Sequence, residues 1–319
     1  MTLNQLRTFL AVAETGSVRA AAQDLVVTQA AVSASLAALQ KSLAVALLEP
    51  DGRGLRLTAA GEAYTGYVRR VLGLLDEAGR AAAAAADPER GELRIAAVTT
   101  AAEQIVPGLL SGFRSRYPRL GIRLEAGNRD RVRGLLDRHQ VDLVLGGRPE
   151  PGWDVRVLAE RPHELVVVAA PGLDARGEPE PEPPRAAGTA HPSADRAGPE
   201  ASHLVPWLAR QAWLLREPGS GTRAATDALL TELDIAPLTL MVGSNGAIRE
   251  SASVGLGVTL ISREAVTAEL ADGRLAALPV PGTPLHRDWY LVARPGPLPP
   301  AAGRLVAHVL AHGGFQPPS

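Results

Sequence analysis

The part of this chain best equipped for ligand chemistry is a short run, residues 219–223, that reads Gly-Ser-Gly-Thr-Arg. The two glycines let backbone N–H groups turn toward one point, the serine and threonine add hydroxyls, and the arginine adds a positive charge. Where such a run opens a helix it is suited to hold an anion, because the first N–H groups of a helix have no partner within it. We predict an anion site formed by Gly219, Ser220, Gly221, Thr222 and Arg223.

Polar residues also follow several of the predicted strands. In open α/β sheets ligands bind at the carboxyl ends of strands, so residues at these ends are candidates for the same ligand. Capping of the next helix is the alternative for each residue alone, and for Thr99 and Asn245 alone it is the better interpretation. The further candidates are Thr99, Thr100, Asn128, Arg148 and Asn245.

The residue patterns of common catalytic and metal sites are missing from the sequence. The chain has no cysteine, and its seven histidines show no metal-ligand spacing. His163 and Glu164 are not followed by a second histidine at the spacing of a zinc protease, and no Gly-x-Ser-x-Gly motif occurs. The single lysine, Lys41, excludes a P-loop. We therefore expect neither an enzyme nor a bound cofactor or metal.

Three short helical patterns occupy the first sixty residues. Gly16 ends the first pattern, Ser17 opens the second helix and Thr28 opens the third. Two short helices joined by a tight turn are typical of a helix-turn-helix, whose second helix enters the major groove of DNA. A small helical bundle of another kind is the alternative from periodicity alone. The outward stripe that we assign to DNA contains Thr28, Gln29, Ala30, Ser33, Ala34 and Ala37, and the buried stripe contains Val32, Leu36 and Leu39.

A Gly-rich hairpin, or wing, is predicted over residues 51–58. It carries Arg53 and Arg56, which we expect to contact DNA phosphates. Residues 1–60 contain five basic and four acidic residues, a net charge of +1, and the whole chain has a net charge of −1. DNA binding must therefore depend on local contacts rather than on bulk charge.

With these features, the N-terminal segment resembles the DNA-binding domain of LysR-type transcriptional regulators. The resemblance runs without gaps over about sixty residues. The chain departs from the family pattern at three places. It has Gln40 where the family usually has glutamate, and Ala44 where the family usually has glycine. Residues 48–50 replace the usual Phe-x-Arg, which removes a basic group beside the wing. The matching residues are Phe9, Val12, Glu14, Gly16, Ser17, Ala21, Ala22, Leu25, Gln29, Ala31, Val32, Ser33, Leu39, Leu57, Thr58, Gly61 and Glu62.

One long helix is predicted over residues 58–86. Apolar residues at three- and four-residue steps form a seam typical of paired helices. Packing against the chain's own second domain is the alternative. The resemblance implies pairing with a second copy, in a homodimer or homotetramer that reads an inverted repeat. The seam contains Tyr64, Tyr67, Val71, Leu74 or Leu75, Ala78 and Ala82.

From Gly91 onward, strand and helix patterns alternate, which indicates α/β architecture with mostly parallel sheets. The resemblance implies two Rossmann-like subdomains resembling periplasmic binding proteins, with chain crossovers that we place near residues 161–164 and 264–268. The expected fold class is therefore α/β, with an N-terminal winged helix-turn-helix, a long linker helix and these two subdomains. The predicted domains are residues 1–58 (DNA-binding), 59–88 (dimerisation helix) and 91–313 (effector-binding), the last divided into subdomain 1 (91–163 and 268–313) and subdomain 2 (164–267).

A proline-rich segment interrupts the second subdomain. Residues 178–184 read Glu-Pro-Glu-Pro-Glu-Pro-Pro and precede small and polar residues that cannot form a core. We interpret residues 174–203 as a disordered insertion, with a docking motif as the alternative.

The resemblance implies a cytoplasmic transcriptional regulator that binds double-stranded promoter DNA and responds to a small metabolite. The predicted anion site indicates that this metabolite is anionic, and RNA polymerase is a further candidate partner. Residues 216–223 and 243–266 are also similar to family members that sense metabolite anions in carbon fixation or sulfur assimilation. No run of about twenty apolar residues occurs, so no membrane association is expected. A small-molecule-binding module and an α/β enzyme, both without a DNA function, are the alternatives.

Overall fold

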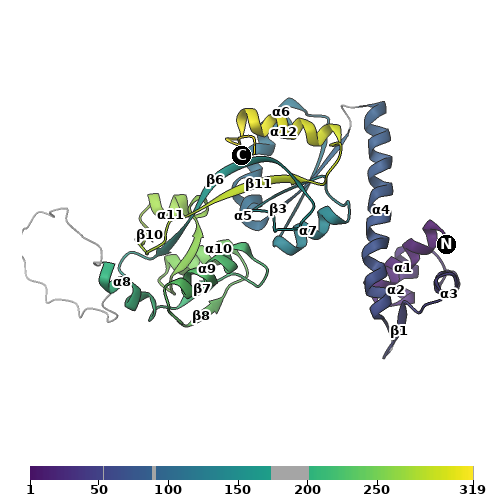
Figure 1. The fold of residues 1–319 in the computed structure, drawn as a ribbon, viewed down its shortest axis with the longest axis horizontal. Helices are drawn as coiled ribbons and strands as arrows, with labels where there is room; N and C mark the ends of the chain where they lie inside the picture. The colour runs from purple at the N-terminus through teal and green to yellow at the C-terminus, as the bar shows by residue number, and fades with distance from the viewer. Residues whose placement is uncertain (53, 88–90, 174–200, 319) are drawn as a thin grey trace, which may run out of the picture.

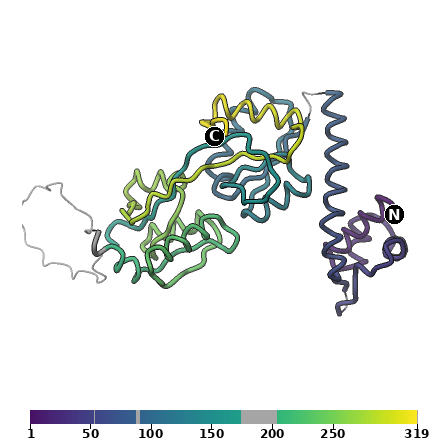
Figure 2. Tube along the Cα trace, in the orientation of Figure 1, coloured from purple at the N-terminus to yellow at the C-terminus, as the bar shows by residue number. Residues whose placement is uncertain are grey.

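The computed structural model describes residues 1–52, 54–87, 91–173 and 201–318, except for the side chains of residues 201–203. A small helical domain lies against one end of a long helix, α4 (Figure 1). Two α/β lobes, named subdomain 1 and subdomain 2, follow it and are joined by two long strands that run side by side (Figure 2). Subdomain 1 lies between α4 and subdomain 2.

The predicted caps set the ends of the three N-terminal helices. Gly16 ends α1 in the left-handed conformation (φ 63°), and Ser17 caps α2. The Thr28 hydroxyl accepts a hydrogen bond from the backbone N–H of Ala31 (3.2 Å), which fixes the start of α3. Helices α2 and α3 are bent by 108° relative to each other, an angle typical of a helix-turn-helix. The helices are α1 (Leu3–Thr15), α2 (Val18–Asp24) and α3 (Gln29–Leu43).

The wing is a two-stranded antiparallel hairpin of β1 (Leu48–Asp51) and β2 (Gly54–Leu57). Gln40 of α3 positions it, because its side-chain oxygen accepts hydrogen bonds from the backbone N–H groups of Leu47 (2.8 Å) and Leu48 (3.3 Å). Gln40 thus supplies the acceptor that a glutamate would supply, without the charge.

Helix α4 (Ala59–Ala86) confirms the prediction of one long helix. Tyr64, which we assigned to the pairing seam, instead packs on Phe9 of the N-terminal core, with ring centroids 5.5 Å apart. Within the described ranges, none of the helices combines the length and hydrophobicity of a bilayer span. The rest of the seam is exposed, at Tyr67, Val71, Leu74, Leu75, Ala78 and Ala82.

Subdomain 1 is built on three parallel strands in the order β4-β3-β5. Helices α5, α6 and α12 pack on one face of this sheet and α7 on the other. Strands β3 and β4 lead directly into α5 and α7, so the N-terminal ends of both helices lie at one edge of the sheet. The elements are β3 (Glu92–Val98), α5 (Thr99–Gln104), α6 (Val106–Arg116), β4 (Gly121–Gly127), α7 (Arg129–Asp137), β5 (Leu143–Gly146) and α12 (Pro300–His312).

Subdomain 2 has a smaller sheet and two buried tryptophans, Trp207 and Trp213, at its centre. Strands β7 and β8 pair in parallel, whereas β9 and β10 pair with the crossover strand β6. The elements are α8 (Ala201–Leu208), β7 (Trp213–Leu215), α9 (Gly221–Glu232), β8 (Thr239–Met241), α10 (Asn245–Ser253), β9 (Thr259–Ser262), a 3-10 helix (Arg263–Val266), α11 (Thr267–Ala271) and β10 (Ala276–Ala277).

Two antiparallel strands, β6 (Arg156–Ala169) and β11 (Leu285–Ala293), carry the chain between the subdomains. The second crossover, predicted near residues 264–268, is therefore wrong. Residues 268–284 belong to subdomain 2, because Leu275 packs in its core and β10 pairs with β6. The expectation of mostly parallel sheets is also wrong for these crossover strands, which run antiparallel to their neighbours.

The predicted insertion, residues 174–203, falls mostly outside the described residues, which resume at residue 201. Its last three residues are not an irregular loop but the first turn of α8. The predicted end of the insertion is therefore three residues too late, because α8 already begins at Ala201.

Helix α4 also contacts subdomain 1 of its own chain. The approach is closest at Gly73, where a Cβ atom would lie 1.9 Å from the carbonyl oxygen of Arg138. One turn further on, the Glu77 carboxylate accepts hydrogen bonds from His139 Nδ1 (2.6 Å) and Arg294 Nη2 (2.8 Å). These residues, together with the ion pair of Arg80 and Asp142, are named the linker contact below.

Candidate functional site

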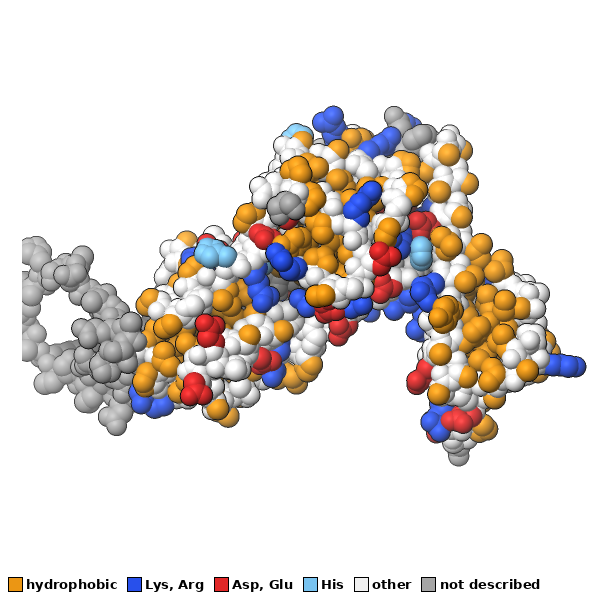
Figure 3. Space-filling view, in the orientation of Figure 1, with side chains coloured by type: hydrophobic (Ala, Val, Ile, Leu, Met, Phe, Trp, Pro, Cys, Tyr) orange, Lys and Arg blue, Asp and Glu red, His pale blue; other side chains and the backbone are white. Residues whose placement is uncertain are grey.

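A cavity of about 550 Å³, named the cleft below, lies between the two subdomains. Its walls come from the N-terminal ends of α5, α7 and α9, from the loop after β5, and from strands β6 and β11. In the space-filling view, basic side chains gather at this junction of the two lobes (Figure 3). Helix N-termini favour anions, so the architecture alone gives the cleft a preference for negative charge.

Basic side chains outnumber acidic ones in the wall of the cleft. Arg287 has no hydrogen-bond or ion-pair partner among the described residues. Burial lowers the pKa of Arg287, and the neighbouring charge of Arg129 lowers it further. Two like charges in the wall of one cavity favour the binding of an anion there. The charged groups are the arginines Arg129, Arg148, Arg216 and Arg287 and the carboxylates Glu150 and Asp288.

Two of the other arginines already have partners. Arg129 Nη1 lies 3.2 Å from a carboxylate oxygen of Glu150. Arg148 Nη2 donates to the Tyr290 hydroxyl (3.3 Å). These contacts orient both side chains, and Arg287 is left as the cation with the most capacity for a ligand.

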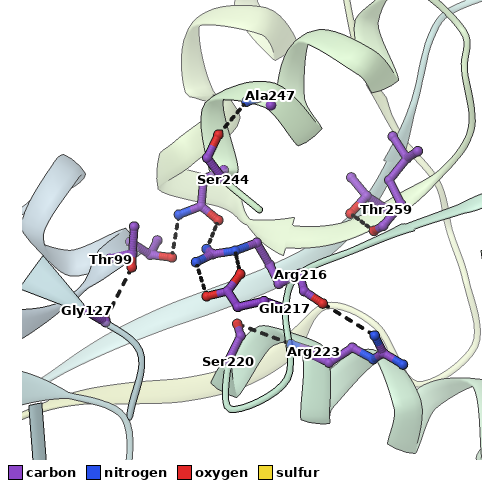
Figure 4. Close-up of polar contacts among 12 residues, drawn as sticks. Thr99, Gly127, Arg216, Glu217, Ser220, Arg223, Ser244, Ala247 and Thr259 are labelled. Atoms are coloured by element: carbon purple, nitrogen blue, oxygen red, sulfur yellow. Dashed lines mark hydrogen bonds and ion pairs between the residues drawn. The ribbon is translucent and has the colours of Figure 1, made fainter. Parts of the chain in front are cut away.

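The buried Arg216, which lines the cleft, belongs to a hydrogen-bond network that joins the two subdomains (Figure 4). Its guanidinium donates to both carboxylate oxygens of Glu217 (2.8 and 2.9 Å) and to the side-chain oxygen of Asn245. The hydrogen bond from Arg216 lowers the pKa of Glu217. The Asn245 amide donates in turn to Thr100 (2.9 Å) and Glu103 (3.3 Å) of α5. This network links α10 of subdomain 2 to α5 of subdomain 1.

The structure brings most of the predicted ligand residues together. Gly219 and Arg223 lie instead in an adjoining shallow depression, where Arg223 forms an ion pair with Asp227 (2.9 Å). Asn245 lies in the network that joins the two subdomains. Effector binding by the residues that line the cleft remains a prediction, whereas the position of Arg223 outside the cleft and its pairing with Asp227 argue against a direct role for it. The predicted residues that line the cleft are Thr99, Thr100, Asn128, Arg148, Ser220, Gly221 and Thr222.

Helix capping, the alternative that we kept for these polar groups, occupies several of them. The side chain of Asn128 accepts from the backbone N–H of Arg131 (3.0 Å), and that of Ser220 accepts from Arg223 (3.5 Å). The Thr99 hydroxyl donates to the carbonyl of Gly127 (3.2 Å). These side chains therefore shape the edge of the cleft and leave the first-turn N–H groups beside the cavity.

Sequence reasoning missed the part of the cleft that the crossover strands provide. His163 of β6 stacks on Trp289 of β11, with ring centroids 4.1 Å apart, and burial lowers the pKa of His163. Residues 286–288 are polar and give no apolar strand pattern, so the sequence did not indicate that β11 begins at Leu285. The missed wall residues on the crossover strands include His163, Arg287, Trp289 and Tyr290, and Arg129 of α7 and Ser262 of β9 were missed as well.

The surface predicted to contact DNA is the outward face of α3 with the wing. In the wing, Arg56 forms an exposed ion pair with Glu49 (2.6 Å) on the neighbouring strand. Arg53 lies outside the described residues. The DNA contacts of these residues remain predictions. The positions Thr28, Gln29, Ala30, Ser33, Ala34 and Ala37 are all exposed.

Replacing Glu49 with glutamine is expected to strengthen DNA binding by releasing Arg56. Affinity for any duplex should rise about two- to fivefold at low salt, and the salt dependence should steepen by about one counterion. Fluorescence anisotropy with promoter and unrelated duplexes measures both effects. Glu125→Gln, the same change of charge in subdomain 1, is the control. Equal gains in both variants would mean that net charge, not the wing, is responsible.

Comparison with protein families identifies both halves of the chain. Residues 3–62 match the family described as "Bacterial regulatory helix-turn-helix protein, lysR family". Residues 86–314 match the "LysR substrate binding domain". The two matches fall on the N-terminal domain with the wing and on the two subdomains around the cleft.

Similar proteins cover nearly the whole chain. The transcriptional regulator CbbR of Xanthobacter flavus is 37% identical over 96% of this chain and 86% of its own length. A RuBisCO operon transcriptional regulator of Acidithiobacillus ferrooxidans is 36% identical over 91% of this chain and 87% of its own length.

Two solved structures are also similar. Full-length CbnR in complex with its target DNA shares the fold (TM-score 0.65, 23% identity, 98% of this chain and 99% of that one). The regulatory domain of Synechocystis PCC6803 CcmR in complex with 2-PG is similar over 70% of this chain and 97% of that one (TM-score 0.57, 26% identity).

Proposed function

This chain belongs to the LysR family of transcriptional regulators, and we propose that it controls an operon for carbon fixation in response to a phosphorylated metabolite. Membership in the family makes it a DNA-binding regulator that responds to a small molecule, and not an enzyme. The target is supported by the similarity to a RuBisCO operon regulator along nearly the whole chain.

The observation that carries the effector class is the position of Arg287. This guanidinium lines the same cleft as Arg129, feels its charge, and has no hydrogen-bond or ion-pair partner among the described residues. A phosphate monoester carries close to two negative charges at neutral pH and offers three acceptor oxygens, so it suits a site with several guanidinium groups and helix N-termini. The CcmR regulatory domain in complex with 2-PG supports the same class.

Promoter recognition is proposed to use two copies of the chain. The exposed apolar seam of α4 supports a homodimer, in which two α3 helices related by a twofold axis read an inverted repeat. A homotetramer, and contact with RNA polymerase at the promoter, belong to the same proposal. The regulator would act in the cytoplasm, where promoter DNA is accessible.

Replacing Arg287 with alanine is expected to weaken binding of phosphorylated metabolites about 10- to 100-fold, the effect of removing one charge-assisted hydrogen-bond donor. Isothermal titration with 2-phosphoglycolate, 3-phosphoglycerate and phosphoenolpyruvate, followed by a thermal-shift panel that includes neutral sugars, measures this loss.

Arg223→Ala is the matched control, because Arg223 is already paired with Asp227 outside the cleft. We expect its affinities to stay within about threefold of the wild type, as for a solvent-exposed pair. Stabilisation of the wild type by neutral compounds alone, or a larger loss in Arg223→Ala than in Arg287→Ala, would refute the assignment.

A further inference from the structure

Helix α7 extends from the cleft to the linker contact. Arg129, its first residue, lines the cleft. Immediately after its last turn, Arg138 meets the backbone of Gly73, and His139 binds Glu77. Nine helical residues span about 13 Å, so a displacement at one end of this short helix moves the other end.

Strand β11 extends between the same two places. Arg287 and Tyr290 line the cleft, and Arg294 follows directly after the strand. Arg294 donates to Glu77 (2.8 Å), and it also donates to the carbonyl groups of Leu136 and Val141 (2.8 Å each). Arg294 thereby ties the end of β11 to the end of α7. Both elements converge on the single carboxylate of Glu77.

Charge holds this carboxylate in place. Burial alone would raise the pKa of Glu77, but the hydrogen bond from His139 and the charges of Arg294 and Arg80 outweigh it and lower the pKa. Glu77 is therefore ionised at neutral pH and remains so until the solution becomes acidic. The contact is made of ion pairs and one backbone approach rather than an apolar core, and polar interfaces of this kind separate and re-form readily.

The seam of α4 does not compete with this contact. Gly73, Glu77 and Arg80 recur at three- and four-residue steps along one side of the helix. The exposed Tyr67, Val71 and Leu74 lie on another side. Helix α4 can therefore pair with a second copy and be held by its own regulatory domain at the same time.

We propose that Glu77 is the coupling residue of this regulator, through which occupancy of the cleft changes the hold of subdomain 1 on α4 and thereby the placement of the DNA-binding domain. An effector that displaces the joined ends of α7 and β11 moves His139 and Arg294 together, and so changes the distance of both from the Glu77 carboxylate on α4. By linkage, DNA binding at the other end of α4 must change the affinity of the cleft for the effector by the same factor. The proposal rests on the proposed function only for the choice of the ligand used to test it.

The test compares operator affinity with and without saturating 2-phosphoglycolate, by fluorescence anisotropy on the promoter beside the protein's own gene. In the wild type this ratio should differ from one by about fivefold or more. In Glu77→Gln, which keeps the shape and removes the charge, it should fall within about twofold of one, while 2-phosphoglycolate still binds with nearly wild-type affinity in the absence of DNA.

Gly73→Ala should abolish the coupling by a different route, since its Cβ collides with the Arg138 carbonyl. Gly66→Ala is the matched control: it lies two turns earlier along the same helix with nothing within 4 Å of the added Cβ, and it should couple normally. A full wild-type ratio in Glu77→Gln would overturn the proposal.

A second measurement does not depend on the effector. Hydrogen exchange in residues 136–142 should change when the wild type binds operator DNA and should not change in Glu77→Gln. If the wild type fails to bind 2-phosphoglycolate but shows this difference, the proposed effector class fails and the coupling residue stands. If exchange responds equally in both proteins, the coupling proposal fails.

Discussion

Replacing Asp142 with alanine is expected to destabilise the regulatory domain by about 3–5 kcal/mol, the effect of removing one partner from a buried ion pair. The Asp142 side chain is almost fully buried, and its carboxylate accepts a hydrogen bond from the backbone N–H of Arg94 (3.0 Å). It also lies 3.7 Å from the Arg94 guanidinium and 3.5 Å from that of Arg80. Burial already lowers the pKa of Arg94, so its charge is costly without the carboxylate.

Urea unfolding of the regulatory domain measures the loss. Glu250→Ala is the control, because the pair of Glu250 with Arg274 is long (3.7 Å) and well exposed. Its removal should change the free energy of unfolding by less than about 0.5 kcal/mol. Similar small changes in both variants would mean that water enters and solvates Arg94 once the carboxylate is gone.

Replacing Gly61 with alanine is expected to abolish operator binding while leaving the effector affinity unchanged. A Cβ at Gly61 would lie 2.0 Å from the carbonyl oxygen of Leu47, the residue that Gln40 holds at the base of the wing. Relief of this collision must shift backbone, which destabilises the DNA-binding domain by about 1–3 kcal/mol and displaces the wing from α3.

Anisotropy on the operator and titration of the effector separate the two halves of that prediction. Gly79→Ala, on the same helix with open space around the new Cβ, should keep operator binding and gain about 0.5–1 kcal/mol of helix stability. Operator affinity within threefold of the wild type in Gly61→Ala would show that the wing base tolerates the shift.

Much of the fold follows from local signals in the sequence. Gly16, Ser17 and Thr28 define helix ends through backbone geometry and hydrogen bonds within four residues, and such information is contained in the local sequence. The long helix α4 and the alternation of strands and helices in the regulatory domain were predicted for the same reason. Pairing between distant strands has no local signal, which is why the polar half of β11 and the true return crossover were missed.

The sequence predicted those site residues that follow a strand and precede a helix, and it did not predict which residues of the two subdomains face the same cleft. Thr99, Asn128 and Ser220 could be inferred because each follows a strand and starts a helix. Arg129 and Arg287 could not be paired from the sequence, since they lie 158 positions apart and meet only through the crossover strands. Arg223 seemed equivalent to them by charge, but its neighbour one helical turn away, Asp227, neutralises it.

The paired crossover strands also set the mechanics of the regulatory domain. Strands β6 and β11 stay in register from Leu285 opposite Leu165 to Ala293 opposite Arg156, with one irregularity at Leu291 and Val292. Only part of this pairing is a two-stranded ribbon, because β5 and β9 pair with the outer parts of the two strands. Residues 286–289 of β11 and 161–164 of β6 pair with each other alone, whereas the irregularity lies where β11 also pairs with β5. Twist is largest in two-stranded ribbons, so we expect torsion between the two lobes to concentrate in residues 286–289 and 161–164. An effector in this cleft would therefore act mainly by rotating one lobe against the other about the paired strands, and less by closing the cleft.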